Sequence, residues 1–220
     1  RTPSGLNGET GAGDADCLRD GDCAGDRIPI RPPARAPLAR SGKPMDIDDL
    51  YPPSEYLEEI LEVLDRKIIG IERQAQACGD PDGWGLCDSM ENFVGFGFVA
   101  CQAHLVSVAS SFKIDKMTAL RLGPTCRSGA TVAEAINHAA NLWKHVDEWV
   151  LGRSQRQQAI TEAGLVASGV APEATNPYSL VLLEIVAPQP FRFASVLPLL
   201  ESWRQDLEQE VASGRGTPAR

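Results

Sequence analysis

The sequence has no surplus of basic residues: 21 Lys and Arg stand against 30 Asp and Glu, which gives the 220 residues a net charge of -9. A chain of this sign is a poor match for generic binding to nucleic-acid phosphates. Aromatic residues are sparse at 6%, and uninterrupted apolar stretches are short, so we expect no membrane-spanning helix. The apolar share of 43% is ordinary for a globular protein and excludes a wholly disordered chain.

Common metal-binding and catalytic patterns are also absent. The six cysteines form no Cys-x-x-Cys pair, which argues against a zinc ribbon or a thioredoxin-type site. No Gly-rich phosphate loop, nucleophile elbow or zinc-protease motif occurs, and we expect no metal and no cofactor. Cys78 and Cys87 flank a loop and could form a disulfide in an oxidising compartment. Because no secretory signal is visible, reduced thiols and a cytoplasmic location are the better interpretation.

The first 44 residues differ in composition from the rest of the chain. They contain 7 Gly and 6 Pro and show no period of 3.6 or 2. Such a segment cannot bury enough surface to offset its ordering entropy, so we predict that residues 1–44 are disordered. Met45 stands where the composition changes, and our hypothesis is that it is the natural start, preceded by read-through or a leader. The alternative is a Pro-rich docking tail.

A helical apolar period begins near Tyr51. Breakers at 53–54 and 79–81 predict where the first helix starts and stops. Charged residues such as Glu58, Glu62 and Asp65 take the opposite face. The predicted inward face consists of Leu57, Ile60, Leu61, Leu64, Ile68 and Ile71.

Local signals predict further helices along the chain. Two capping boxes, at 88–91 and 131–134, open helices over 89–111 and up to residue 151, with Gly152 as the stop. The helix that ends near residue 151 has a predicted inward face, which consists of Ala135, Ile136, Ala139, Ala140, Trp143, Val146 and Val150. Asn176 followed by Pro177 begins an apolar helix to 186, and a last helix covers 196–211. A short helix is expected over 155–163.

These elements indicate the fold class. Asn-Gly hairpins and alternating strand patterns are absent after residue 44, although 93–100 and 178–186 could each form a strand instead of a helix. We therefore predict an all-α single domain at 45–212, a bundle of about four main helices plus short ones, with a disordered tail at 213–220.

One predicted helix carries a concentration of polar side chains. The strip comprises Asn137, His138, Asn141, Lys144, His145 and Glu148. Steps of three and four residues keep side chains neighbours on one helix face. A histidine can move protons near neutral pH, and Lys and Asn can hold a phosphate or polarise a carbonyl. The plain alternative is a surface or inter-helix polar stripe, with Lys144 and Glu148 forming an ordinary pair one turn apart.

The pattern Asn141-x-x-Lys144-His145, late in a capped helix of a small all-helical protein, resembles the HEPN superfamily. That resemblance implies a helical bundle, commonly dimeric, and an RNA-cleaving toxin or defence protein with an antitoxin as a protein partner. His145 takes the place of the family's histidine. The family's arginine has no counterpart, since 138–140 hold His-Ala-Ala.

If the resemblance holds, the protein is a metal-independent ribonuclease. His145 would be the general acid or base, while Asn141 and Lys144 would position the phosphate, with His138, Asn137 and Glu148 as binding residues. The rival hypothesis is a non-enzymatic helical protein-interaction module, and a third is a small-molecule sensor with a pocket between helices.

His104 and Trp84 lie outside this strip, and the sequence predicts an environment for each of them. His104 lies among apolar residues and is expected to be a satisfied buried histidine; with Cys101 it supplies too few ligands for a metal site. Trp84, in a Gly-rich loop, is expected to pack on the bundle as a lid.

Overall fold

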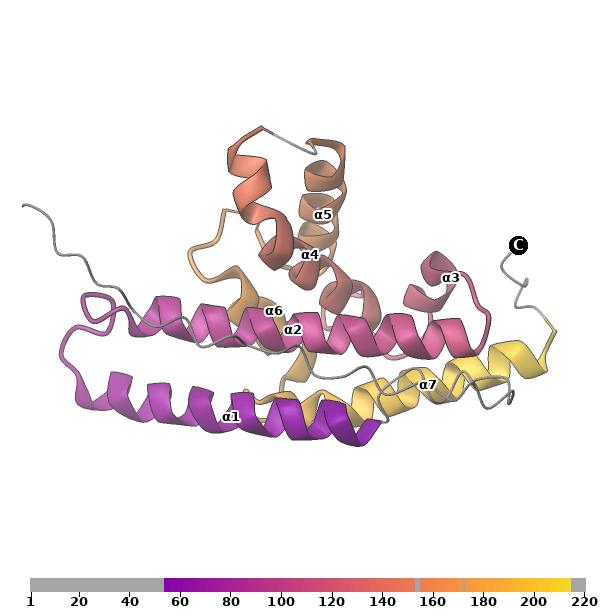
Figure 1. The fold of residues 1–220 in the computed structure, drawn as a ribbon, viewed down its shortest axis with the longest axis horizontal. Helices are drawn as coiled ribbons and strands as arrows, with labels where there is room; N and C mark the ends of the chain where they lie inside the picture. Colours follow the sequence, from indigo (N-terminus) through magenta and orange to yellow (C-terminus); the bar gives the residue numbers. More distant parts are fainter. Residues whose placement is uncertain (1–53, 153–154, 172, 215–220) are drawn as a thin grey trace, which may run out of the picture. The chain divides into compact units, whose positions relative to one another are not determined.

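A computed structural model of the chain describes residues 54–152, 155–171 and 173–214 (Figure 1). The predictions for residues 1–44, for Met45 and for residues 215–220 lie outside these ranges. The regular elements are α1 (Ser54–Ala77), α2 (Leu86–Ser111), α3 (Lys116–Leu120), α4 (Val132–Val150), α5 (Gln155–Ala167), α6 (Pro177–Val186), the 3-10 helix η2 (Phe193–Ser195) and α7 (Leu197–Ala212).

The fold is all-α, as predicted. Within the described ranges no strand forms, and the β-type pairing there is one isolated bridge between Thr125 and Thr131. Residues 93–100 and 178–186, for which a strand was the alternative, lie inside α2 and α6. The described helices all belong to one compact unit, Pro44–Arg220.

Helices α1 and α2 run antiparallel and side by side (Figure 1). From α1, Leu57, Leu61 and Ile68 are buried against this partner and the rest of the core, as the periodicity predicts. The assignment of Ile60 to the inward face was wrong, because its side chain is 49% exposed. Residues at 57 and 61 already fill the seam with α2, so position 60 falls on the flank of the helix pair.

The capping box predicted at 88–91 does not form. Helix α2 begins earlier, at Leu86, after Gly85 in the left-handed conformation (φ 66°). Glu91 instead lies inside the helix and accepts hydrogen bonds from the backbone N–H groups of Tyr178 and Ser179, both at 2.9 Å. A carboxylate from α2 therefore caps the N-terminus of α6, whose own Asn176 makes no side-chain capping bond.

Asp65 of α1 has the same role at η2. It is buried, and its two carboxylate oxygens accept from the N–H groups of Phe193 at 2.8 Å and Ala194 at 2.9 Å. The sequence pattern had placed Asp65 on the solvent face, which was wrong. A buried carboxylate is stable here because both of its oxygens receive backbone donors.

Two glycines in the middle of α2 allow close packing. A Cβ atom added at Gly95 would lie 1.9 Å from the Trp143 ring, and one added at Gly97 would lie 2.1 Å from the Phe193 ring. Glycine costs about 1 kcal/mol relative to alanine inside a helix. Here the close approach of two large aromatic rings offsets that cost, since any larger residue would displace them.

Helix α4 begins as predicted. Thr131 Oγ1 accepts from the Glu134 N–H at 3.1 Å, and Glu134 Oε2 accepts from the Thr131 N–H at 3.3 Å. Four alanine and isoleucine positions of the expected inward face are fully buried. Val146 is exposed, contrary to prediction, while Trp149 is buried; the side chain of Val150 lies outside the description.

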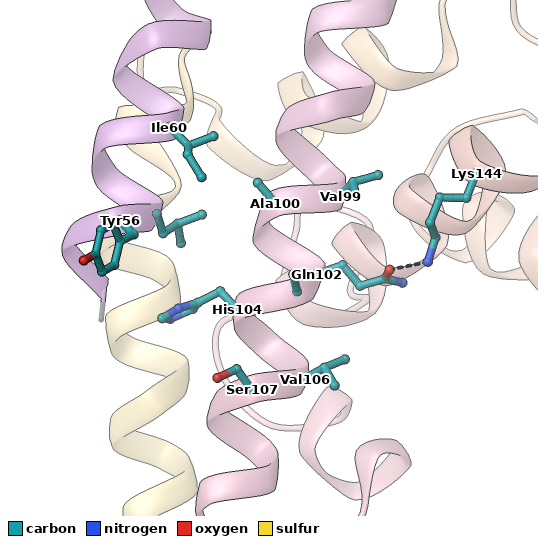
Figure 2. Close-up of a pocket in the computed structure, with 11 residues that line it drawn as sticks. Tyr56, Ile60, Val99, Ala100, Gln102, His104, Val106, Ser107 and Lys144 are labelled. Carbon is teal, nitrogen blue, oxygen red and sulfur yellow. Dashed lines mark hydrogen bonds between the residues drawn. The ribbon is translucent and has the colours of Figure 1, made fainter. Parts of the chain in front are cut away.

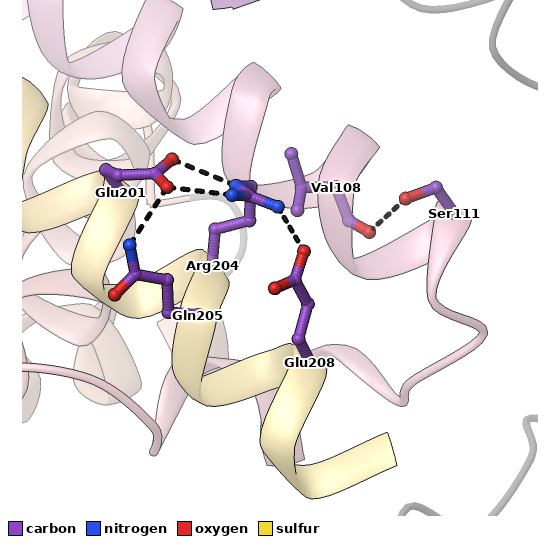
Figure 3. A network of polar contacts seen from close by, with 6 residues as sticks. All are labelled: Val108, Ser111, Glu201, Arg204, Gln205 and Glu208. Atoms are coloured by element: carbon purple, nitrogen blue, oxygen red, sulfur yellow. Dashed lines mark hydrogen bonds and ion pairs between the residues drawn. The ribbon is translucent and has the colours of Figure 1, made fainter. Parts of the chain in front are cut away.

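Helix α7 has Pro198 in its first turn, as expected. Buried Trp203 donates from Nε1 to the Ala119 carbonyl at 2.8 Å, which ties α7 to α3. On the surface, Arg204 pairs with Glu201 at 2.7 Å and also with Glu208 (Figure 3). The Arg204 hydrogen bonds lower the pKa of Glu201 to about 2. The positive charge of Arg204 is thus matched by two carboxylates.

The loop that joins α1 and α2 differs from expectation at Trp84. Trp84 is 77% exposed, so it does not pack on the bundle as a lid. Cys78 and Cys87 form no disulfide in this structure.

Contrary to the expectation of no such segment, α2 is long and apolar enough to cross a membrane by length and composition alone. A core helix of a soluble protein passes the same test, and α2 packs against α1, α4 and α6 in this fold.

Candidate functional site

The amides of the predicted polar strip are directed at α2. Asn137 and Asn141 are both buried, and each accepts a hydrogen bond on its side-chain oxygen from Gln102 Nε2, at 2.9 Å and 3.0 Å. Gln102 Nε2 also lies 3.2 Å from the Asn137 carbonyl oxygen. These contacts hold α4 against α2, so the inter-helix interpretation of the two asparagines describes what they do in this fold.

The same glutamine fixes the position of Lys144. Because its Nε2 donates to the asparagines, its Oε1 faces away from them and accepts from Lys144 Nζ at 2.6 Å (Figure 2). Sequence reasoning missed Gln102. The available signal was a long amide in the stretch Val99 to Val106, whose only other polar residue is His104; such an amide is unusual in a buried helix unless it has partners.

His138 lies on a different side of α4 from this network, against α5. A Cβ atom added at Gly164 would be 2.2 Å from the His138 ring, so the imidazole and the α5 backbone are in close contact. Burial lowers the pKa of His138, and the Glu134 carboxylate opposes that shift. Its Nδ1 has no hydrogen-bond partner among the described residues.

His145 is separate again. Its Nδ1 lies 3.2 Å from Glu148 Oε2, and its ring stacks on Trp149 with the centroids 6.2 Å apart. Glu148 therefore pairs with His145, whereas the sequence had suggested a pair with Lys144. The six residues of the strip divide into an amide–lysine network on α2, a histidine under α5, and a half-exposed histidine–carboxylate pair.

This division limits what the strip can do chemically. Asn141 is only 9% exposed and its oxygen is already bonded to Gln102, so holding a substrate phosphate would require it to leave the network. Lys144 and His145 remain accessible at the surface. No cluster of three His, Cys, Asp or Glu side chains suited to a metal ion occurs in the described part of the chain.

A groove of about 520 Å³ lies beside the network, between α1, α2 and Lys144 of α4. Figure 2 shows Tyr56 and Ile60 on one side, Lys144 on the other, and α2 side chains between them. We call it the α1–α2 groove. Its lining consists of Tyr56, Leu57, Ile60, Val99, Ala100, Gln102, Ala103, His104, Val106, Ser107 and Lys144.

The α1–α2 groove is apolar with one cation. Lys144 supplies the ammonium, and the lining includes no carboxylate from the described residues. His104 is half-buried at its edge, not enclosed in the core as expected, and burial lowers its pKa while Glu201 opposes the shift. Cys101 is fully buried, and no third His, Cys, Asp or Glu among the described residues joins it and His104 in a cluster that could hold a metal ion.

Comparison with known proteins returned no relatives: no family model matches the chain, and no significant match occurs among curated proteins or solved structures. The functional argument therefore depends on the geometry of this fold.

Proposed function

We propose that the protein is a non-enzymatic binding module that holds an apolar or amphipathic small molecule in the α1–α2 groove. The observation that carries this proposal is the groove itself, whose volume falls within the range of about 300–1,000 Å³ typical of small-molecule sites. Its character also fits, because such sites are mainly apolar with a few fixed polar groups. Gln102 and Lys144 are the fixed polar groups here.

Exposed apolar side chains in the groove supply the driving force. Tyr56, Ile60 and Val106 are 55%, 49% and 42% exposed, although each is large enough to belong in a core. Contact with a ligand would remove this surface from water and gain roughly 25 cal/mol per Å² of apolar area. The floor is formed by Ala100 and Ala103, whose short side chains leave room above α2.

The test is binding of a neutral environment-sensitive dye, N-phenylnaphthylamine, to the full chain. We expect its fluorescence to rise on binding to the wild type and to fall strongly with Ala103→Phe, which fills the groove floor. Ala159→Phe is the matched control, because Ala159 is also an exposed helical alanine but lies on α5, away from the groove. The control should bind the dye as the wild type does.

Two outcomes would contradict the proposal. One is the absence of dye binding, or equal binding by both phenylalanine variants. The other is dye binding that declines as the protein concentration rises while sedimentation shows self-association, since a second copy would then cover the groove. Competition by a protein partner would favour the protein-interaction module instead.

A second candidate function remains the metal-independent ribonuclease, supported by the His145–Glu148 pair. A carboxylate 3.2 Å from the ring nitrogen can orient an imidazole for proton transfer. RNA integrity and growth on expression should then differ between the wild type and His145→Ala, with the exposed neighbour Asp147→Ala as control. A homodimer, an antitoxin partner and a cytoplasmic location are further parts of this second proposal.

A further inference from the structure

Lys144 is the feature of the α1–α2 groove that can select a ligand. The ion pairs of the described residues match Arg66 with Glu62, Arg192 with Glu72, and Arg204 with carboxylates of its own helix, but none includes Lys144. Other surface cations are also unpaired. Lys144 differs from them because it lines an apolar groove and is held there by a buried amide.

The amide network positions this ammonium in advance. Gln102 cannot rotate its amide without breaking its bonds to Asn137 and Asn141, so its Oε1 stays directed at Lys144. An ammonium has three donors, and Gln102 accepts from one of them. Two donors remain for a ligand, and little side-chain freedom is left to lose on binding.

The charge near this end of the groove is positive, although the whole chain is acidic. Lys116 of α3 is close enough to Lys144 to add to the desolvation that lowers the pKa of its ammonium. The groove lining contributes no carboxylate from the described residues. A ligand with a negative group would therefore meet the Lys144 ammonium, in the field of the nearby Lys116, and no like charge from the lining.

The opposite side of the groove is apolar. Tyr56, Leu57 and Ile60 come from α1, and Figure 2 shows Tyr56 and Ile60 across α2 from Lys144. A ligand that fits both sides has one anionic end and an extended apolar body. One ammonium without an arginine fork suits a singly charged carboxylate better than a doubly charged phosphate.

We infer that the α1–α2 groove binds an amphipathic carboxylate, with its head group on Lys144 and its apolar chain lying across α2 toward Tyr56 and Ile60. This inference rests on the proposed function, because it names the ligand class of the same groove.

The test is displacement of N-phenylnaphthylamine by decanoate, decanol and decylamine, with the two charged compounds below their micelle concentrations and decanol below its solubility limit. We expect decanoate to displace the dye at about tenfold lower concentration than decanol, because a charge-assisted hydrogen bond adds to the same apolar contact. Decylamine should be weaker than decanol. Octanoate should be about tenfold weaker than decanoate, since it lacks two methylene groups.

Variants separate the head-group contact from the apolar contact. Lys144→Met should abolish the preference for decanoate over decanol, while Lys144→Arg should retain most of it. Lys67→Met is the matched control, because Lys67 is an exposed lysine on α1 that does not line the groove. Circular dichroism and urea unfolding would confirm that each variant is folded.

The outcomes distinguish the two proposals. If the dye binds in the groove but decanoate and decanol displace it equally, the carboxylate inference is overturned and the proposed function stands. Retention of the decanoate preference by Lys144→Met would overturn the inference in the same way. If the dye does not bind at all, both proposals fail.

Discussion

Helix α4 packs against α2 on one face and against α5 on another. The two interfaces differ in whether their buried polar groups have hydrogen-bond partners. On the α2 side, Gln102, Asn137, Asn141 and Lys144 are joined by hydrogen bonds of 2.6–3.0 Å between their side chains. A buried amide network that is satisfied in this way favours one register of the two helices.

On the α5 side, three buried polar atoms lack a hydrogen-bond partner among the described residues. His138 Nδ1, Trp149 Nε1 and Thr161 Oγ1, all from the two helices of this interface, are buried without a hydrogen-bond partner in the described ranges. Each such group costs about 1–3 kcal/mol. The comparison teaches that one helix can have a face whose polar groups specify its partner and another face whose polar groups do not.

The largest effect should come from Gln102→Leu. This change leaves the oxygens of Asn137 and Asn141 and the ammonium of Lys144 without their shared partner, and we expect the free energy of unfolding to fall by about 3 kcal/mol. Urea unfolding measures it. The control Gln158→Ala removes a single bond to Glu162 one turn away and should cost no more than about 0.5 kcal/mol. If both variants lose the same free energy of unfolding, the network contributes no more to stability than a single surface hydrogen bond.

A smaller effect is expected at Gly164, on the α5 side. Gly164→Ala places a methyl group 2.2 Å from the His138 ring, which forces the helices apart and should destabilise by about 1–3 kcal/mol. The matched change Gly70→Ala, in α1, meets no atom within 4 Å and should stabilise by up to about 1 kcal/mol. Thermal unfolding of both variants checks this. A stabilised Gly164→Ala protein would mean that α5 is not closely packed on α4.

Thr161→Val should stabilise the protein by about 1 kcal/mol. The substitution keeps the shape of a fully buried side chain and removes a hydroxyl that has no partner among the described residues. Thr118→Val is the contrasting change, because the Thr118 hydroxyl donates to Asp115 at 3.1 Å and its removal should slightly destabilise. Loss of stability in Thr161→Val would show that this hydroxyl is bonded in solution.

The smallest effect concerns pH. Burial lowers the pKa of His138, so the unfolded chain binds more protons than the folded protein. The stability contributed by neutral His138 is therefore complete above the ordinary histidine pKa of about 6.5 and declines as the pH falls below it. His138→Gln should reduce this slope in unfolding measured across pH. An unchanged slope would assign the effect to His104, whose pKa burial also lowers.

The sequence predicted elements where the signal was local. Thr131 and Glu134 are three residues apart, and the capping box that they form was predicted correctly. Pro198 was placed in the first turn of its helix for a similar reason. Such signals need no knowledge of where other helices lie.

Contacts distant in sequence were not predictable from the pattern. Glu91 caps a helix 87 residues away, and Asp65 binds backbone 128 residues away, so neither role is visible in a local window. Gln102 similarly meets Asn137 only after α2 and α4 pack together. Ile60 had the correct helical period but lies at the edge of the packed face, which depends on how closely α2 approaches.

The central claim is that the asparagines of α4 serve the interface with α2. The most direct measurement is a double-mutant cycle of Gln102→Leu and Asn141→Leu, followed by urea unfolding of the full chain. We predict a coupling energy of about 1 kcal/mol or more, with the double variant less destabilised than the sum of the single variants. If the losses of unfolding free energy are additive, the claim is contradicted. Asn141 would then be independent of Gln102 and could have the substrate-binding role of the ribonuclease hypothesis.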